Sequence, residues 1–176
     1  ETQPMTSNSR DNMVKPEWMD DEQWAFFKDA TSSLERIRGD SKADIERYLE
    51  SPEDWVKAET SPSGFPTLLL TMIGRKSGER RTTPLVFMPN GEDMIVVGSL
   101  AGYDNHPVWV LNLDADPNCW VQCGTKTMTA TARDASDQER AELWPRLVET
   151  FPAWGYFQGQ TERPFSIKIL SPTGPA

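Results

Sequence analysis

Residues 74–84 carry the pattern of the sequence that is best suited to binding a ligand. Four cations fall within seven positions of a chain whose formal net charge is -9: Arg75, Lys76, Arg80 and Arg81. Gly74 and Gly78 frame the turn, and Ser77 lies between them. Backbone N–H groups at such a turn point outward, and guanidinium groups bind phosphate through paired hydrogen bonds. The stretch therefore predicts an anion receptor.

Two other interpretations of this stretch were weighed. A solvated hairpin tip with ordinary surface charge has the same local composition. A P-loop needs Gly-Lys-Ser/Thr after a second glycine and then a helix. Here Arg75 separates Gly74 from Lys76, and Pro84 opens a β-type run. The density of cations in an acidic chain favours the anion receptor.

Composition limits the classes of protein that the chain can belong to. Its 176 residues suffice for one domain with extensions, and the hydrophobic share of 37% places part of the chain outside the core. The negative charge argues against nonspecific binding to nucleic acid or anionic lipid. With Cys119, Cys123 and one histidine, a metal site is not expected. No apolar run approaches 18 residues, so we expect a soluble, cytoplasmic protein with buried thiols.

The N-terminal third has a helical pattern. Residues 1–12 are polar and unpatterned, which predicts a disordered tail. Residues 13–63 are expected to form a helical extension, and three roles stay open for it: packing on the domain, a lid over a pocket or a dimer contact. One helix is expected over about 16–31, and another from Ser41 until Pro52 breaks it. The acidic residues between Trp18, Trp24, Phe26 and Phe27 argue against binding of this extension to a membrane surface.

Residues 64–176 have a sequence pattern that is typical of strands. A continuous apolar run at 67–73 predicts a buried strand. Asn105 is expected to cap a helix that ends before Pro117, and Ser136 to open another through a capping box. The six predicted strands are 67–73, 82–88, 94–99, 118–123, 127–134 and 165–170. Because helices connect antiparallel hairpins, the expected fold class is α+β, a twisted barrel of about six mainly antiparallel strands with outer helices.

Several of these motifs together resemble one family. The run PTLLLTMIGRKSGERRTTP from Pro66 to Pro84, followed by HPVWVLNL at 106–113 and Asp116-Pro117, is similar to the deazaflavin (F420)-dependent nitroreductase and quinone reductase family. The resemblance covers about residues 64–172. It implies a split β-barrel related to the FMN-binding flavin reductases, with residues 64–176 as the deazaflavin-binding domain.

The resemblance also implies a cofactor site. The phosphate and oligoglutamate tail of coenzyme F420 would lie over the cationic turn. Pro84 and residues 97–99 would flank the ring, with Trp109 and Asn112 closing its ribityl side, although Trp109 could equally be core. The implied cofactor-binding residues are Arg75, Lys76, Ser77, Arg81, Thr82, Thr83, Pro84, Val97, Ser99, Val108, Trp109 and Asn112. Ser99 is a candidate proton relay; His106 before Pro107 more often marks a structural turn.

The implied acceptor contacts depart from the family pattern. They are Val86, Leu100, Trp154 and Phe157. Many members have an aromatic residue at the first of these positions and a basic residue at the second. A tyrosine pair of nitro-reducing relatives corresponds to Trp154 and Phe157. The loss of two phenols counts against nitroimidazole reduction and leaves flat, hydrophobic, conjugated acceptors.

The expected function is an F420H2-dependent oxidoreductase that transfers a hydride to a quinone, enone or nitro compound. An FMN-dependent split-barrel oxidoreductase is one alternative, since FMN also carries phosphate. A non-catalytic carrier of F420 is another. The expected partners are a hydrophobic small-molecule acceptor and a second copy of the chain in a homodimer, with no nucleic acid and no membrane.

Overall fold

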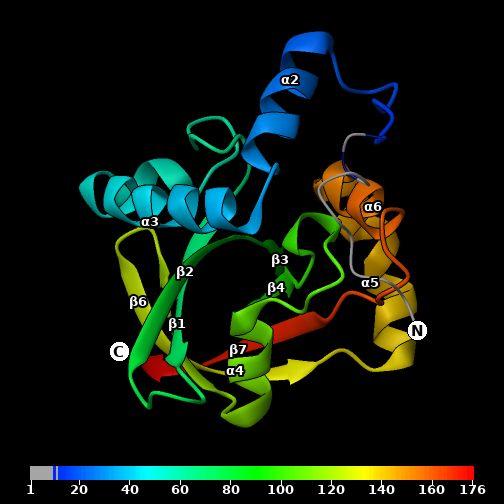
Figure 1. Cartoon of the computed structure of the whole chain (residues 1–176). Coiled ribbons are helices and arrows are strands. Elements are labelled where there is room, and N and C mark those ends of the chain that lie inside the picture. Colours follow the sequence, from blue (N-terminus) through cyan, green and yellow to red (C-terminus); the bar gives the residue numbers. More distant parts are fainter. Residues whose placement is uncertain (1–9, 11) are drawn as a thin grey trace.

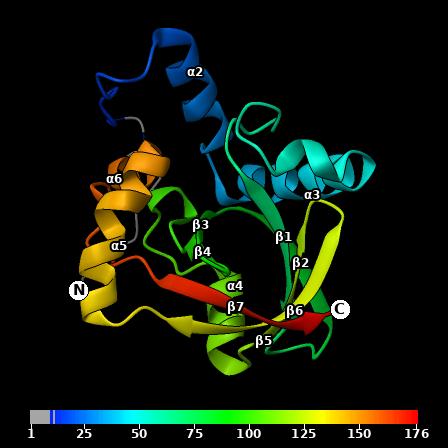
Figure 2. The ribbon, with the colours of Figure 1, turned by 180° about the vertical axis from the view of Figure 1, so that it is seen from behind.

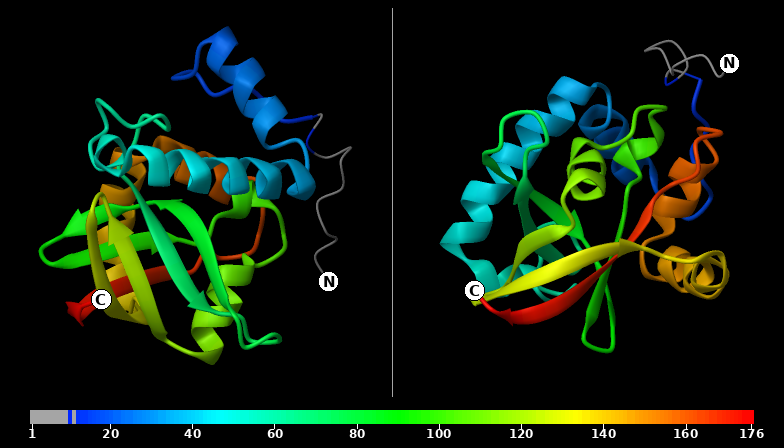
Figure 3. Two further views of the ribbon diagram at one scale, coloured as in Figure 1. Left: turned by 90° about the vertical axis from the view of Figure 1, so that its left-hand side faces the viewer. Right: turned by 90° about the horizontal axis from the view of Figure 1, so that it is seen from below.

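The computed structural model describes residue 10 and residues 12–176, and most of the predicted tail at 1–12 lies outside these residues. One antiparallel seven-stranded sheet, in the order β2-β1-β5-β6-β7-β4-β3, organises the chain (Figure 1). The strands are β1 Thr67–Ile73, β2 Arg80–Val86, β3 Met88–Asn90, β4 Asp93–Val97, β5 Asn118–Cys123, β6 Lys126–Asp134 and β7 Ile167–Pro175. Only Phe87 separates the two edge strands, β2 and β3, in the sequence. The sheet therefore curls into a half-barrel, as Figure 3 shows.

Strand β1 is covered on both faces, which explains its continuous apolar sequence. Leu68, Leu70 and Met72 point into the main core cluster and are at most 1% exposed. Leu69 points the other way and packs against Tyr48 and Trp55 outside the sheet. The alternation of faces along a strand assigns consecutive residues to different cores.

Two helices cover another side of the sheet. α5 (Asp137–Thr150) begins with the predicted capping box, in which the Ser136 hydroxyl accepts from the Glu139 N–H and the Glu139 side chain from the Ser136 N–H. α6 (Pro152–Gln158) follows at once and packs against α5 (Figure 2). The sequence analysis did not predict α6, because Pro152 was taken only as the end of α5. Proline at a first helical turn is, however, well tolerated.

The N-terminal helices differ in their bounds from the prediction. α2 spans Asp21–Ala30, because Asp20 forms a capping box with Gln23. α3 spans Leu34–Glu50, and the Ser33 hydroxyl accepts from the Arg36 N–H at 3.0 Å. The expected start at Ser41 was therefore wrong: Ser33 is the capping residue, and Ser41 lies inside the helix. Within the described residues, no helix is long and apolar enough to span a bilayer.

α4 (Val108–Ala115) lies near the end of the half-barrel opposite to α3 (Figure 1). Its N-cap position is Pro107, so the predicted cap by Asn105 was wrong. The buried Lys168 of β7 forms an ion pair with Asp114 of α4 and another with Asp134 at 2.9 Å. Burial lowers the pKa of Lys168, but its bonds to the two carboxylates outweigh burial and raise it. This cation therefore ties α4 to the sheet.

Candidate active site

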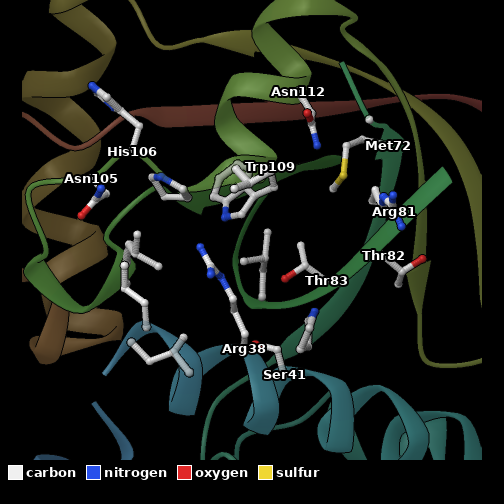
Figure 4. A pocket seen from close by; sticks show the side chains of 18 of the residues that line it. Arg38, Ser41, Met72, Arg81, Thr82, Thr83, Asn105, His106, Trp109 and Asn112 are labelled. Carbon is white, nitrogen blue, oxygen red and sulfur yellow. The ribbon is translucent and has the colours of Figure 1, made fainter. Parts of the chain in front are cut away.

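A cavity of about 1020 Å³ opens between α3, the β1–β2 hairpin, the end of β4 and α4 (Figure 4). Polar and apolar side chains are mixed on its walls: α3, β2 and α4 each contribute both kinds, β4 contributes apolar Val97, and the cationic turn contributes polar and charged groups. A volume of this size is typical of a site for a cofactor together with a small substrate.

The charges on the cavity wall have one sign. Five Lys and Arg side chains line it, and within the described residues no Asp or Glu does; the five are Arg38, Lys42, Arg75, Lys76 and Arg81. The whole chain has 27 acidic residues against 18 Lys and Arg. A wall of cations alone in an acidic protein attracts an anionic ligand.

The cationic turn is held by its own backbone. The Gly74 N–H donates to the Glu79 carbonyl at 2.8 Å, and the Gly78 N–H donates to the Gly74 carbonyl at 2.8 Å. Gly78 has a φ of +71°, and a Cβ on Gly74 would lie 2.6 Å from Ser77 Oγ. The Ser77 hydroxyl accepts from the Glu79 N–H at 3.1 Å, which leaves its own hydrogen to donate to a ligand.

The side chains of the turn are available to an anion. Arg75 and Lys76 are exposed and have no ion pair within the part of the chain that the structure describes. Arg81 contacts Glu79 at 3.3 Å, and both side chains are exposed. Such a surface pair is weak, so a phosphate or carboxylate can replace it.

Asn112 connects α4 to the turn. Its side chain is 2% exposed, and its Oδ1 accepts from the Arg75 N–H at 3.1 Å. Figure 4 shows its amide nitrogen on the cavity side. Trp109, one turn earlier, both lines the cavity and belongs to the main core cluster. The ring of Trp109 therefore packs in the core and also borders the cavity.

The loop after β4 is strained and firmly held. Leu100 and Ala101 have φ values of 40° and 52°, which is uncommon for residues with a side chain. Arg163 is 9% exposed and donates to the carbonyls of Gly98 at 2.8 Å, Ser99 at 2.9 Å and Tyr103 at 2.8 Å. Burial lowers the pKa of this guanidinium. Arg163 thereby fixes the backbone that presents Ser99 to the cavity.

A second arginine holds the same loop from outside. Arg10 donates to the Ala101 carbonyl at 3.0 and 3.1 Å, and its guanidinium lies 4.0 Å from the centroid of the Tyr103 ring. The Tyr103 hydroxyl in turn donates to the Thr31 carbonyl at 2.9 Å, beyond the end of α2. Neither arginine was predicted as a site residue, since both act through backbone carbonyls that a sequence does not locate.

All twelve predicted cofactor-binding residues line this cavity, and Leu100 does as well. Three predicted acceptor contacts do not. Trp154 and Phe157 are 3% and 7% exposed in a second core cluster, and Val86 packs against that cluster. Phe27 of α2 stacks on Phe157 with the ring centroids 5.2 Å apart. These three side chains lie outside this cavity and pack in or against the second core cluster, to which α6 contributes Trp154 and Phe157. Their role in binding the acceptor stays a prediction.

α3 contributes a wall of the cavity that was not predicted from the sequence. Its lining residues are Leu34, Ile37, Arg38, Ser41, Lys42 and Ile45. They recur at intervals of three and four positions, which is the spacing of one helical face. The signal was present in the sequence, but the start assigned to Ser41 cut the stripe in two.

Comparisons with known proteins agree on one family. The family model described as F420H(2)-dependent quinone reductase matches residues 52–172. The putative F420H(2)-dependent quinone reductase Rv3178 of Mycobacterium tuberculosis (strain ATCC 25618 / H37Rv) is 38% identical over 107 residues, which are 61% of this chain and 90% of that protein. The F420H(2)-dependent quinone reductase Rv1261c of the same strain is 32% identical over 114 residues, 62% of this chain and 76% of that protein.

Two solved structures are also similar. One, described as an F420-H2 dependent reductase (FDR-A), has a TM-score of 0.56 and 34% identity, and the match covers 60% of this chain and 94% of that one. Another, described as a domain-swapped dimer, has a TM-score of 0.57 and 32% identity, with 69% of this chain and 100% of that one covered.

Proposed function

Because the chain belongs to the F420H(2)-dependent quinone reductase family, we propose that its cavity binds coenzyme F420 beside a quinone and that the protein catalyses reduction of the quinone. The observation that carries this proposal is the position of the cations. Five Lys and Arg side chains, with no acid among the described lining residues, face a cavity that lies mostly within the matched region.

The residues present fit an anionic cofactor with a flat ring. The turn offers Arg75, Lys76 and the Ser77 hydroxyl to phosphate and carboxylate groups, with Arg81 beside them. The apolar surfaces of Pro84 and Trp109 suit a conjugated ring. When bound, reduced F420 supplies a hydride from its C5 position.

Residues of the chain orient the cofactor and the quinone and supply a path for the proton that the reduced quinone takes up. Trp109 and Asn112 line the cavity. Arg163 fixes the loop from which Ser99 lines the cavity. The Ser99 hydroxyl makes no hydrogen bond within the described part of the chain, so it is free to donate to a ligand. We assign it the role of relaying a proton to the reduced acceptor, which a Ser99→Ala variant tests through its rate.

The family match favours F420 over FMN, which the sequence had left open. Enones and nitro compounds are further proposed acceptors, supported by the apolar cavity wall. A homodimer is proposed as well; its support is the similar structure described as a domain-swapped dimer, together with the exposed Trp18 and Phe26 near and on α2. A cytoplasmic location is proposed from the two free cysteines.

Turnover and binding measurements together test the proposed function. We expect the purified protein to oxidise reduced F420 in the presence of 2-methyl-1,4-naphthoquinone. Lys76→Ala and Arg75→Ala should each weaken F420 binding by about 1–3 kcal/mol, because each removes a charged hydrogen bond. Lys57→Ala is the matched control, since Lys57 is exposed and does not line the cavity.

Three outcomes of this experiment would count against the proposal. Equal affinity of all variants would remove the turn from the cofactor site. Tight F420 binding without turnover for any acceptor would support a carrier. Turnover with FMN in place of F420 would keep the fold and overturn the cofactor.

A further inference from the structure

α3 adds a wall to the cavity that the family model does not include. The model match begins at residue 52, whereas α3 ends at Glu50. Figure 4 shows Arg38 and Ser41 on one side of the cavity and Asn112 and Met72 on the opposite side. Arg38 therefore lies apart from the end of the cavity where Asn112 binds the cationic turn.

Arg38 differs from the other arginines near it on this helix. Arg36 contacts Asp40 and Asp29, both at 3.1 Å, and Arg47 contacts Asp44 at 3.3 Å. Arg38 has no hydrogen bond or ion pair within the described residues, and its side chain extends from α3 into the cavity (Figure 4). A guanidinium in a cavity without a counter-ion is ready to bind a ligand oxygen.

Apolar side chains lie beside Arg38 on the cavity wall. Leu34 and Ile37 precede it on the lining face of α3, where Ser41 and Lys42 follow it, and Leu100 and Ala101 line the cavity from the loop after β4. Apolar wall residues next to a cationic group suit a flat, uncharged ring that carries a carbonyl oxygen.

We propose that α3 builds the acceptor end of the cavity and that Arg38 donates hydrogen bonds to a quinone oxygen; this inference rests on the proposed function. Reduction adds a hydride, two electrons with one proton, to the quinone, while the cofactor is oxidised and releases its second proton to solvent. The product of this step is a hydroquinone monoanion, and a proton from water, relayed by Ser99, completes the hydroquinone. Arg38 faces the oxygen on which the negative charge develops, so it stabilises the transition state more than the neutral quinone.

The phosphate of the cofactor has other cations available to it besides Arg38. Arg75, Lys76 and Arg81 already provide cations at and beside the turn. Lys42 lies one helical turn beyond Arg38 and also lines the cavity. The acceptor role therefore predicts two effects that can be measured separately: loss of Arg38 impairs reduction of the acceptor, and it leaves the affinity for F420 unchanged.

The test compares Arg38→Met and Arg38→Lys with Arg36→Met, a control on the same helix that does not line the cavity. Three quantities are measured: the Kd of oxidised F420 by fluorescence, kcat and KM for 2-methyl-1,4-naphthoquinone, and the Kd of anionic 2-hydroxy-1,4-naphthoquinone for the F420-loaded protein. The anion imitates the charge of the product without turnover. Far-UV circular dichroism checks that each variant is folded, as expected for an exposed side chain.

We expect Arg38→Met to lower kcat and the affinity for the anion by about 10- to 100-fold each, as for a lost charged hydrogen bond. The Kd of F420 should change by less than about twofold. Arg38→Lys should recover part of both losses, because it keeps the charge but not the paired donors. Arg36→Met should behave as the wild type.

Two results would overturn the acceptor role. A loss of F420 affinity in Arg38→Met equal to that in Arg75→Ala would assign Arg38 to the cofactor, and equal losses in Arg36→Met would assign it to the stability of the helix. Failure of the wild type to bind F420 would instead overturn the proposed function, and so the two failures are distinguishable.

Discussion

The half-barrel and the N-terminal helices contribute to one cavity but are built differently. In β1 five of the seven residues are buried, whereas α2 has no buried residue and α3 has only Tyr48. The half-barrel lies within the matched region except for the end of β7, and it supplies the cationic turn. Both helices lie before residue 52, and α3 alone supplies the facing wall, because no residue of α2 lines the cavity. Strand β1 and helix α3 therefore differ in how deeply they are buried, although residues of both line one cavity.

The largest expected effect separates packing from ligand contact at Trp154. Trp154→Ala should lower the free energy of unfolding by about 3–5 kcal/mol, because the side chain is 3% exposed in the second core cluster. Phe26→Ala on α2 is the control: that side chain is 72% exposed, and its loss should be within about 0.5 kcal/mol. Urea denaturation measures both. If the Trp154→Ala protein were as stable as the wild type but had an altered acceptor preference, Trp154 would contact the acceptor instead of stabilising the core.

A smaller effect is expected where the barrel fixes the loop after β4. Arg163→Met should lower the free energy of unfolding by about 2–3 kcal/mol, because three carbonyls lose a charged donor. F420 affinity should fall as well, because Ser99 is no longer fixed. Arg146→Met is the matched control, since Arg146 is exposed and its side chain, among the described residues, bonds only to Asn90 at 3.2 Å. If a destabilised Arg163→Met protein bound F420 normally, the loop after β4 would not contribute to the cofactor site.

The smallest effect concerns the anchor of α3. The Tyr48 hydroxyl donates toward the Thr67 carbonyl at 3.1 Å and accepts from the Gly124 N–H at 2.9 Å. Tyr48→Phe should therefore lower the free energy of unfolding by about 1–2 kcal/mol at neutral pH. F420 affinity should be unchanged, because the turn does not depend on α3. A variant as stable as the wild type would show that α3 is held by its apolar contacts alone.

The same tyrosine predicts a pH dependence. Burial raises the pKa of Tyr48 from 10.0 to about 12. The folded state thus favours the neutral phenol, and this contribution to stability is complete below pH 10 and lost as the pH rises toward 12. Unfolding curves at pH 9 and pH 11 should therefore show a larger fall for the wild type than for Tyr48→Phe. Parallel falls would remove Tyr48 from the alkaline transition.

Local patterns made the barrel predictable. The strand at 67–73, the hairpin at residues 89–92 and the capping box at Ser136 each depend on neighbouring residues, and the structure has all three. The cationic turn was found in the same way, because its glycines and cations are adjacent in the sequence. The family resemblance then placed Trp109 and Asn112, which the cavity brings to the turn.

Long-range packing limited the rest of the prediction. The burial of Trp154 and Phe157 depends on Phe27, more than a hundred residues away, and no local pattern pairs them. Arg163 binds carbonyls about 60 residues distant. In α3 the error was local, since two serines could serve as the cap and Ser33, not Ser41, does so. Because of that error, Arg38 was not predicted as a site residue.

The most direct test of the central claim is a fluorescence titration of the purified protein with oxidised F420, run beside FMN at the same salt concentration. The account predicts micromolar or tighter binding of F420, no binding of FMN, and an affinity for F420 that falls as salt rises, because cations of the turn hold the anionic groups. Preference for FMN, or F420 binding that is indifferent to salt and to Lys76→Ala, would contradict it.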